Sequence, residues 1–304
     1  MAFDLSKMHT ELYNSEEFLK IQKIIIFNHS LNIFVGNYEE FRNFLSYMVE
    51  NPNSFELSSP YNRNQLKLMQ NENLRLLHNY VSSAFSLIDH TRIHYRDLYE
   101  PNNLMTDYQD HVDKMFKESP IAAFIVGLRQ YAQHYRTPSI SFQSIWSRAE
   151  GMCSKICISK NDILSFSGWN SKAKSYLKNS VEHIDLKNVI DEYYKIVIKF
   201  YTWFKSQQEE IHKNEFDRFE KKQKEYFDKI IPHIIDTFEP TVKNGQVDIL
   251  EIFQSVFEKE ELIEFENPEL SRSELFDGIV KVINKRCELN DYYLNKLKNL
   301  VMNQ

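Results

Sequence analysis

Glycine and proline are scarce in this chain, and their scarcity limits the folds open to it more than any other feature. They number 6 and 8 among 304 residues, roughly 5% where an average chain has about 12%. A strand-rich fold needs these residues at its many turns, so we expect a mostly helical protein. With 42% hydrophobic residues, the chain can bury a sizeable core. The glycines are too scattered to form a nucleotide-binding glycine loop.

The first residues and the cysteines bear on where the protein works. MAFDLSKMHTELYN has no basic region followed by an apolar core. The longest uncharged apolar run, residues 121–128, is far shorter than the ~20 residues that cross a bilayer. We therefore expect a cytoplasmic protein without a membrane partner. Cys153, Cys157 and Cys287 are an odd number of cysteines, and the first two have C-x3-C spacing. This pattern fits reduced structural thiols better than a zinc or redox motif.

Apolar periodicity predicts an all-α multi-helix bundle. Helices are expected over residues 15–49 with a break near Gly36, 64–99, 107–117, 120–136, 159–166, 171–179, about forty residues after Asp185, 247–259 and 271–302. Alternation of apolar and polar residues predicts a small β-hairpin near 140–158. We expect an N-terminal helical region (1–62), a helical core that holds the candidate site (63–180) and a C-terminal helical region (181–304), or one continuous helical domain.

Positive charge is concentrated in one part of an acidic chain. The chain has 37 Lys and Arg against 43 Asp and Glu, a net charge of -6, so no overall basic field attracts nucleic acid. Residues 124–178, however, contain eight basic and two acidic residues. This window has a net charge of +6 and the remainder -12. A polyanion is expected to approach this window, although ordinary charge fluctuation explains the pattern about as well.

The expected helix over 120–136 has well-marked ends. Ser119 is suited to the N-cap and Pro120 to the first helical position. Thr137 precedes Pro138, which disfavours helical geometry at Thr137, so the helix should end at Tyr135 or Arg136.

One face of this helix lacks the charges of a solvent-facing surface. Its residues are small or neutral: Ala122, Ala123, Val126, Gly127, Gln130 and Gln133. Small side chains allow another helix to approach closely, so something should pack there. Arg129 and His134 border the face on its two sides. If the partner is the same helix of a second copy, twofold symmetry brings two arginines and two histidines to one seam.

Arginine and histidine at such a seam fit metal-independent RNA cleavage. An imidazole exchanges protons near neutral pH, and a guanidinium binds phosphate oxygens. One imidazole would assist attack of the ribose 2′-hydroxyl on the adjacent phosphate while the guanidinium stabilises the charge on phosphorus. The products would be a cyclic phosphate and a free 5′-hydroxyl.

The segment from Arg129 to His134, RQYAQH, resembles the Arg-x4–6-His signature of the HEPN superfamily. The context LRQYAQHYRTP, a helix end followed directly by Pro138, is also similar to bacterial HEPN-like proteins. Gln130 stands where the family commonly has Asn or another short polar residue. The resemblance implies a helical bundle over residues 63–180 that acts as a homodimeric endoribonuclease without a cofactor or metal, in a toxin or antiphage defence setting. It implies Arg129 and His134 as catalytic residues, RNA as a partner, and an antitoxin or regulatory protein as a further partner.

We also assign candidate RNA-binding residues within the basic window. They are Gln130, Gln133, Arg136, Arg148, Lys155 and Lys160. The alternative hypothesis is a non-catalytic HEPN-like interaction protein that keeps the bundle and binds a protein or nucleic acid through the same seam. The net charge of -6 and Gln130 favour this alternative.

Two other patterns have structural explanations that we prefer. His90, His94 and Asp97 share a helical face with metal-ligand spacing, but hydrogen bonding between helices explains them better. The three tryptophans could stack on bases, but core packing is the better explanation for most of them.

Overall fold

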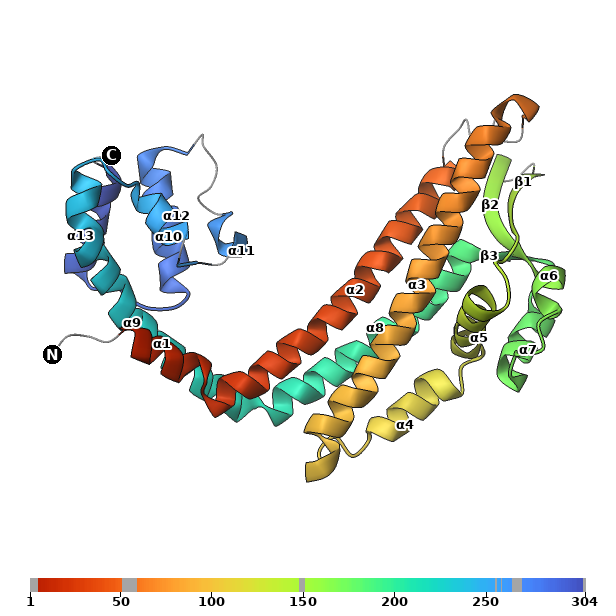
Figure 1. Ribbon diagram of the computed structural model, residues 1–304, viewed down its shortest axis with the longest axis horizontal. Coiled ribbons are helices and arrows are strands. Elements are labelled where there is room, and N and C mark those ends of the chain that lie inside the picture. Colours follow the sequence, from red (N-terminus) through yellow and green to blue (C-terminus); the bar gives the residue numbers. More distant parts are fainter. Residues whose placement is uncertain are drawn as a thin grey trace. The chain divides into compact units, whose positions relative to one another are not determined.

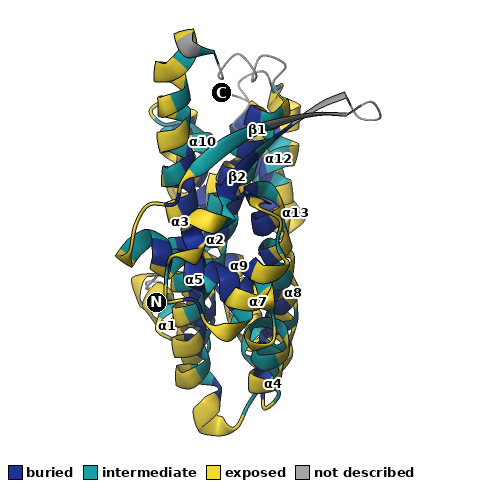
Figure 2. Cartoon of the chain, turned by 90° about the vertical axis from the view of Figure 1, so that its right-hand side faces the viewer, coloured by how far each residue is buried: buried dark blue, intermediate teal, exposed yellow. Residues whose placement is uncertain are grey.

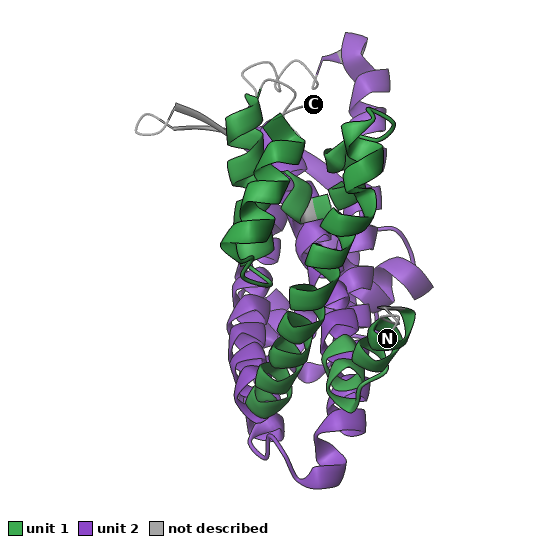
Figure 3. Cartoon of the chain, turned by 90° about the vertical axis from the view of Figure 1, so that its left-hand side faces the viewer, with its two compact units in different colours: residues 1–22, 212–304 green, residues 23–211 purple. Residues whose placement is uncertain are grey.

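The computed structural model describes residues 5–50, 59–147, 151–254, 256–257, 259–263 and 270–302. It is mostly helical, with one small antiparallel sheet (Figure 1), which confirms the expected all-α bundle with a hairpin. The chain divides into two compact units (Figure 3): unit 1 comprises residues 1–22 and 212–304, and unit 2 comprises residues 23–211. Within the described ranges, no helix is long and apolar enough to span a membrane.

Unit 2 is built around three long helices. These are the part of α2 (Glu16–Glu50) from residue 23 onward, α3 (Arg63–Leu98) and α8 (Leu186–Ile211). Their apolar faces meet in one core rich in aromatic rings, shown dark blue in Figure 2. Phe34, Tyr80 and Tyr193, one from each helix, are almost fully buried and have ring centroids within 6.5 Å of one another.

Shorter helices complete unit 2. The 3-10 turns η2 (Pro60–Asn62) and η3 (Glu100–Asn102) flank α3. α4 (Tyr108–Val112) continues into a π-helical turn, η4 (Asp113–Lys117), in which the Glu118 N–H donates to the Asp113 carbonyl at 2.9 Å. α5 (Pro120–His134), α6 (Lys160–Leu164) and α7 (Ser171–Asn179) follow.

The sheet of unit 2 has the strand order β1-β2-β3, all antiparallel. β1 (Ile140–Ser147) and β2 (Gly151–Ser159) form the expected hairpin, with Ile140 opposite Ile158. A third strand, β3 (His183–Asp185), pairs with the end of β2 and was not expected from the sequence. Because β3 ends at Asp185 and α8 begins at Leu186, this pairing places the start of α8 next to the hairpin. Asp185 Oδ1 also accepts the Lys187 N–H in the first turn of α8 at 3.0 Å.

Unit 1 has a separate helical core. It contains α1 (Leu5–Tyr13), the first residues of α2, α9 (Lys213–Lys243), α10 (Ile249–Gln254), α11 (Lys259–Leu262), α12 (Arg272–Asn284) and α13 (Asp291–Met302). Buried residues of α9, α10, α12 and α13 pack together with Leu12 of α1. Ser271 and Glu274 form a reciprocal capping box that fixes the start of α12.

Several helix boundaries differ from expectation, and three of them are informative. α2 runs through Gly36 without a break, because an exposed glycine lowers helix stability without preventing the helix. The forty-residue helix expected after Asp185 is two helices, α8 and α9, that meet at His212. The helix expected over 271–302 is also two, α12 and α13. The sequence suggested boundaries at 62 and 180, or one continuous helical domain, and the two compact units divide the chain after Gln22 and after Ile211.

Candidate nucleic-acid site at the end of helix α5

The helix that carries the RQYAQH segment begins where the sequence indicates and ends one residue before the expected Tyr135 or Arg136. Ser119 Oγ accepts the Ala122 N–H at 3.3 Å, Pro120 is the first helical residue, and His134 is the last. α5 packs in unit 2 against α3, α7 and α8. The candidate catalytic residues therefore lie on an element that is anchored on several sides.

The chain's own side chains cover the first half of the small-residue face. Ala122, Ala123 and Gly127 are all buried. Gly127 lies against the Trp169 ring so closely that a Cβ atom there would be 2.4 Å from two ring carbons. The small residues of this half are therefore explained by packing within one chain, without a second copy.

The second half of the same face remains accessible. Gln130 and His134 are exposed, and Val126 and Gln133 are half-buried. His134, in the last turn of α5, is thus open to solvent, as an RNA-cleaving histidine must be. The Gln133 side-chain amide donates to Ser82 Oγ of α3 at 2.7 Å.

Arg129 lies at the border between α5 and α3. Its guanidinium carbon is 3.8 Å from the centroid of the Phe85 ring, a cation–π contact. Its Nε is buried and has no hydrogen-bond partner. Buried polar atoms nearly always have a partner, so this donor is an exception among the described residues.

Two of the candidate RNA-binding residues, Lys155 and Lys160, have partners within their own chain. Lys155 lies 3.9 Å from Asp185, and the Lys160 ammonium donates to the Ser180 carbonyl at 2.7 Å. Arg136 is exposed and lies over its neighbour Tyr135, with 4.8 Å between the guanidinium carbon and the ring centroid. Arg148 lies outside the described residues. The basic window therefore contributes Arg129 and Arg136 to the end of α5, whereas Lys155 and Lys160 already bind acceptors of their own chain.

The alternative patterns have structural explanations in unit 2. His94 is buried, stacks on Phe27 at 4.4 Å and lies 2.8 Å from the Gln208 amide nitrogen. His90 lies 2.7 Å from Ser30 Oγ. Hydrogen bonding between helices, the preferred explanation, is thus confirmed for both histidines. Trp169 is a buried core residue, as expected for most of the tryptophans.

Two cysteines are also structural. Cys157 and Cys287 are buried free thiols, and burial raises the pKa of each to about 11. Both thiols therefore stay protonated near neutral pH. The side chain of Cys153 lies outside the described residues.

Two residues next to the site were not singled out from the sequence. Ser82 and Phe85 of α3 contact Gln133 and Arg129 respectively. Their spacing of three places them on one helical face with His78, four residues earlier. That signal was present in the sequence, but nothing in it tells which helix α3 would meet.

Comparison of the chain with protein-family models, with curated proteins and with solved structures gave no match.

Proposed function

We propose that the chain is a HEPN-type, metal-independent endoribonuclease whose site lies at the C-terminal half of α5. The observation that carries this proposal is the contrast between Arg129 and His134 on one helix. Arg129 has a buried Nε–H without an acceptor, and five residues later His134 is exposed. Because the Arg129 Nε is buried, the side chain must turn away from Phe85 before a phosphate oxygen can accept from it. The phosphodiester held in this way would lie beside the imidazole.

The chemistry follows from the two side chains. The His134 imidazole accepts the proton of a ribose 2′-hydroxyl, and the 2′-oxygen attacks the adjacent phosphorus. The Arg129 guanidinium stabilises the added charge on the phosphate oxygens. A second imidazole protonates the leaving 5′-oxygen. In a cytoplasmic homodimer, the partner's copy of this histidine supplies that proton.

The surface available for a second copy is smaller than the sequence indicated. Gln130 and His134 are exposed, whereas Ala122, Ala123 and Gly127 are already covered by their own chain. A composite site therefore requires two α5 helices to meet at their C-terminal ends. Sedimentation of the purified protein measures whether they do, and a monomer would exclude the composite arrangement.

The test is cleavage of structured and single-stranded RNAs in EDTA, with analysis of the product ends. We expect cyclic phosphate and 5′-hydroxyl ends from the wild type. His134→Ala should slow cleavage by roughly 100-fold or more, the usual contribution of an acid–base group. Arg129→Lys keeps the charge but lacks the planar fork and should also slow cleavage.

The matched control is His29→Ala, which removes an exposed histidine from α2 in the same unit. It should cleave at the wild-type rate. Circular dichroism must show that all three variants remain folded. Equal cleavage by His134→Ala and His29→Ala would refute the proposed role of His134.

A second candidate function is that of a non-catalytic interaction protein. The closed first half of the α5 face and the internal partners of Lys155 and Lys160 favour it. It predicts RNA that stays intact. If the protein retards RNA in gels without cleaving it, and Arg136→Ala weakens that binding, this second function replaces the first.

A further inference from the structure

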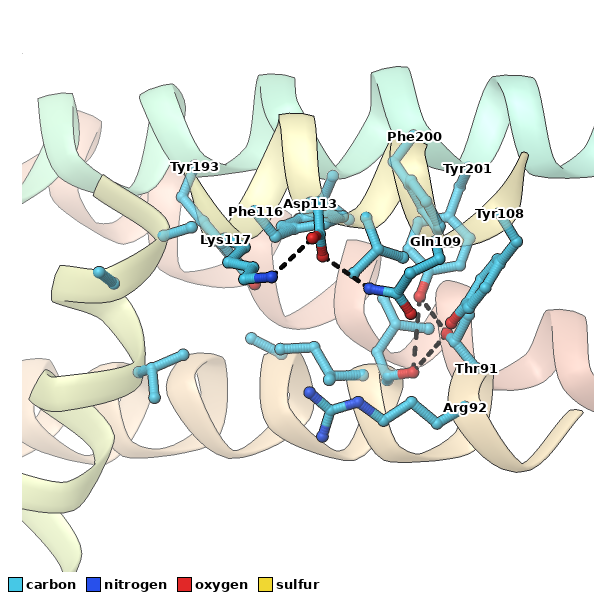
Figure 4. A pocket seen from close by; sticks show the side chains of 18 of the residues that line it. Thr91, Arg92, Tyr108, Gln109, Asp113, Phe116, Lys117, Tyr193, Phe200 and Tyr201 are labelled. Carbon is cyan, nitrogen blue, oxygen red and sulfur yellow. Dashed lines mark hydrogen bonds and ion pairs between the residues drawn. The ribbon is translucent and has the colours of Figure 1, made fainter. Parts of the chain in front are cut away.

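A cavity of about 500 Å³ opens beside the first half of α5 in unit 2. It lies between α3, α4 with its π-helical turn η4, α5 and α8 (Figure 4). Its volume falls within the ~300–1,000 Å³ typical of small-molecule sites. The cavity exists because small side chains line it where these elements approach one another, namely Ala84, Ala122 and Ala123.

The interior of the cavity is apolar. Leu87, Val197 and Phe200 form part of its wall and are almost fully buried in the fold. Two of its buried hydroxyl groups already have partners: Thr91 Oγ1 donates to the Leu87 carbonyl at 2.6 Å and is hydrogen-bonded to the Tyr201 hydroxyl. The Thr91 and Tyr201 hydroxyls therefore do not require a hydrogen bond from a ligand, and an apolar group binds in this space more favourably than a polar one.

The rim of the cavity is polar and carries a net positive charge. The lining residues include three cations, Arg92, Lys117 and Lys172, and one carboxylate, Asp113. Arg92 also lies 3.5 Å from Asp89 Oδ1, so the rim together with this neighbour has a net charge of +1. Figure 4 shows Arg92 on one side of the opening and Lys117, Asp113 and Gln109 on the other. Asp113 accepts from Lys117 and from Gln109, each at 2.6 Å, so its own charge is already balanced.

The π-helical turn positions the second side of this rim. The Glu118 N–H donates to the Asp113 carbonyl five residues earlier, which widens the turn. Val112, Asp113, Phe116 and Lys117, in and next to this turn, all line the cavity. π-Helical turns are rare and occur frequently at functional sites.

We propose that this cavity binds an anionic amphipathic small molecule, with its apolar body among α3, α5 and α8 and its carboxylate at the cationic rim. The apolar interior selects the body, and the excess positive charge of the rim selects an anion over a cation. The binding needs no RNA and does not rest on the proposed nuclease activity.

The test is calorimetric titration of the full chain with decanoate and, separately, with decyltrimethylammonium, which carries the same alkyl chain and the opposite charge. We expect decanoate to bind with a stoichiometry of one and to raise the melting temperature. The cationic analogue should bind at least about tenfold more weakly. Absence of decanoate binding, or equal binding of the two amphiphiles, overturns the proposal.

Substitutions at the rim test where the carboxylate of the ligand binds. Arg92→Gln should weaken decanoate binding about tenfold, the loss expected for a charged hydrogen bond. Arg96→Gln is the matched control, because Arg96 is exposed one turn later on α3 and does not line the cavity. Equal affinities of these two variants would contradict the assigned place of the carboxylate.

Val126→Phe and Ile88→Phe fill the cavity from α5 and from α3, and both positions are only half-buried. Each variant that keeps the wild-type circular dichroism spectrum should lose decanoate binding. A folded variant of either kind with wild-type affinity shows that the ligand lies elsewhere and overturns the proposal. Because Arg92 is exposed, the Arg92→Gln titration decides the matter even if both filling variants unfold.

Discussion

The small size of Gly127 has two different explanations, one from the sequence and one from the structure. In the sequence, its small size suggests close approach of a second helix. In the structure, the Trp169 ring occupies the space next to it. Trp169 is held there because its indole N–H donates to the Ile163 carbonyl at 2.8 Å and its ring stacks on Phe124. The glycine is therefore required by a buried tryptophan of the same chain.

Gly127→Ala should destabilise the protein by about 1–3 kcal/mol, the usual cost of overpacking a core. The new Cβ would be 2.4 Å from the Trp169 ring, which its hydrogen bond and stacking hold in place. Gly36→Ala is the control, since a Cβ atom added at this exposed position of α2 would have no atom within 4 Å. It should instead stabilise by roughly 0.5–1 kcal/mol. Urea unfolding measures both, and equal effects of the two substitutions would rule out the packing explanation.

At the scale of elements, a polar cluster joins α2 to α8 within unit 2. Asp191 of α8 accepts from the Tyr38 hydroxyl at 2.8 Å and from the Arg42 guanidinium at 3.2 Å, both on α2. Lys187, one turn earlier on α8, also donates to it at 3.1 Å. Burial by itself raises the pKa of Asp191, but these hydrogen bonds and positive charges together hold it below its ordinary value of 3.8.

This cluster makes the stability of unit 2 depend on pH. A carboxyl group whose pKa is lower in the folded than in the unfolded chain stabilises the fold above its ordinary pKa, and that contribution is lost as the pH falls through the folded value. Asp191→Asn should therefore destabilise most near pH 7 and progressively less below about pH 4. Urea unfolding of both proteins across this range measures the difference. A free-energy difference that stays constant down to the lowest pH at which both proteins fold contradicts the ionic role of Asp191.

The elements themselves were largely predictable, for local reasons. Ser119 with Pro120 and the Thr137-Pro138 pair carry the signals that begin and end α5, and both act over a few residues. β3 was missed because a strand of three residues is too short to show an alternating pattern of apolar and polar residues. It forms only by pairing with β2. The division between α8 and α9 was missed because apolar residues continue on both sides of His212.

At the scale of the whole molecule, the described chain has two separate hydrophobic cores. One joins buried residues between Phe27 and Phe204, and the other joins Leu12 with buried residues from Tyr226 onward. Each core lies within one compact unit. A unit with its own core can unfold by its own transition.

Paired substitutions test this separation. Ile190→Val and Ile279→Val each remove one methylene from a fully buried side chain, in unit 2 and unit 1 respectively, and each should cost about 0.5–1.5 kcal/mol. All three tryptophans belong to unit 2, so tryptophan fluorescence, excited at a wavelength that tyrosine does not absorb, reports that unit alone. In urea, Ile190→Val should shift the fluorescence midpoint, whereas Ile279→Val should shift only the part of the circular dichroism signal that unit 1 contributes. A fluorescence midpoint that moves equally in both variants means that the chain unfolds as one cooperative unit.

The sequence by itself determined the helical class, the start of α5 and the hairpin, because these depend on composition, period and signals between near neighbours. Only the tertiary structure decided which helix face is free. It set Trp169 against Gly127, left the Arg129 Nε without a partner beside Phe85, and formed a cavity whose lining extends from Ala84 to Tyr201. Such contacts join residues tens of positions apart, and no periodicity along the chain encodes which of them meet.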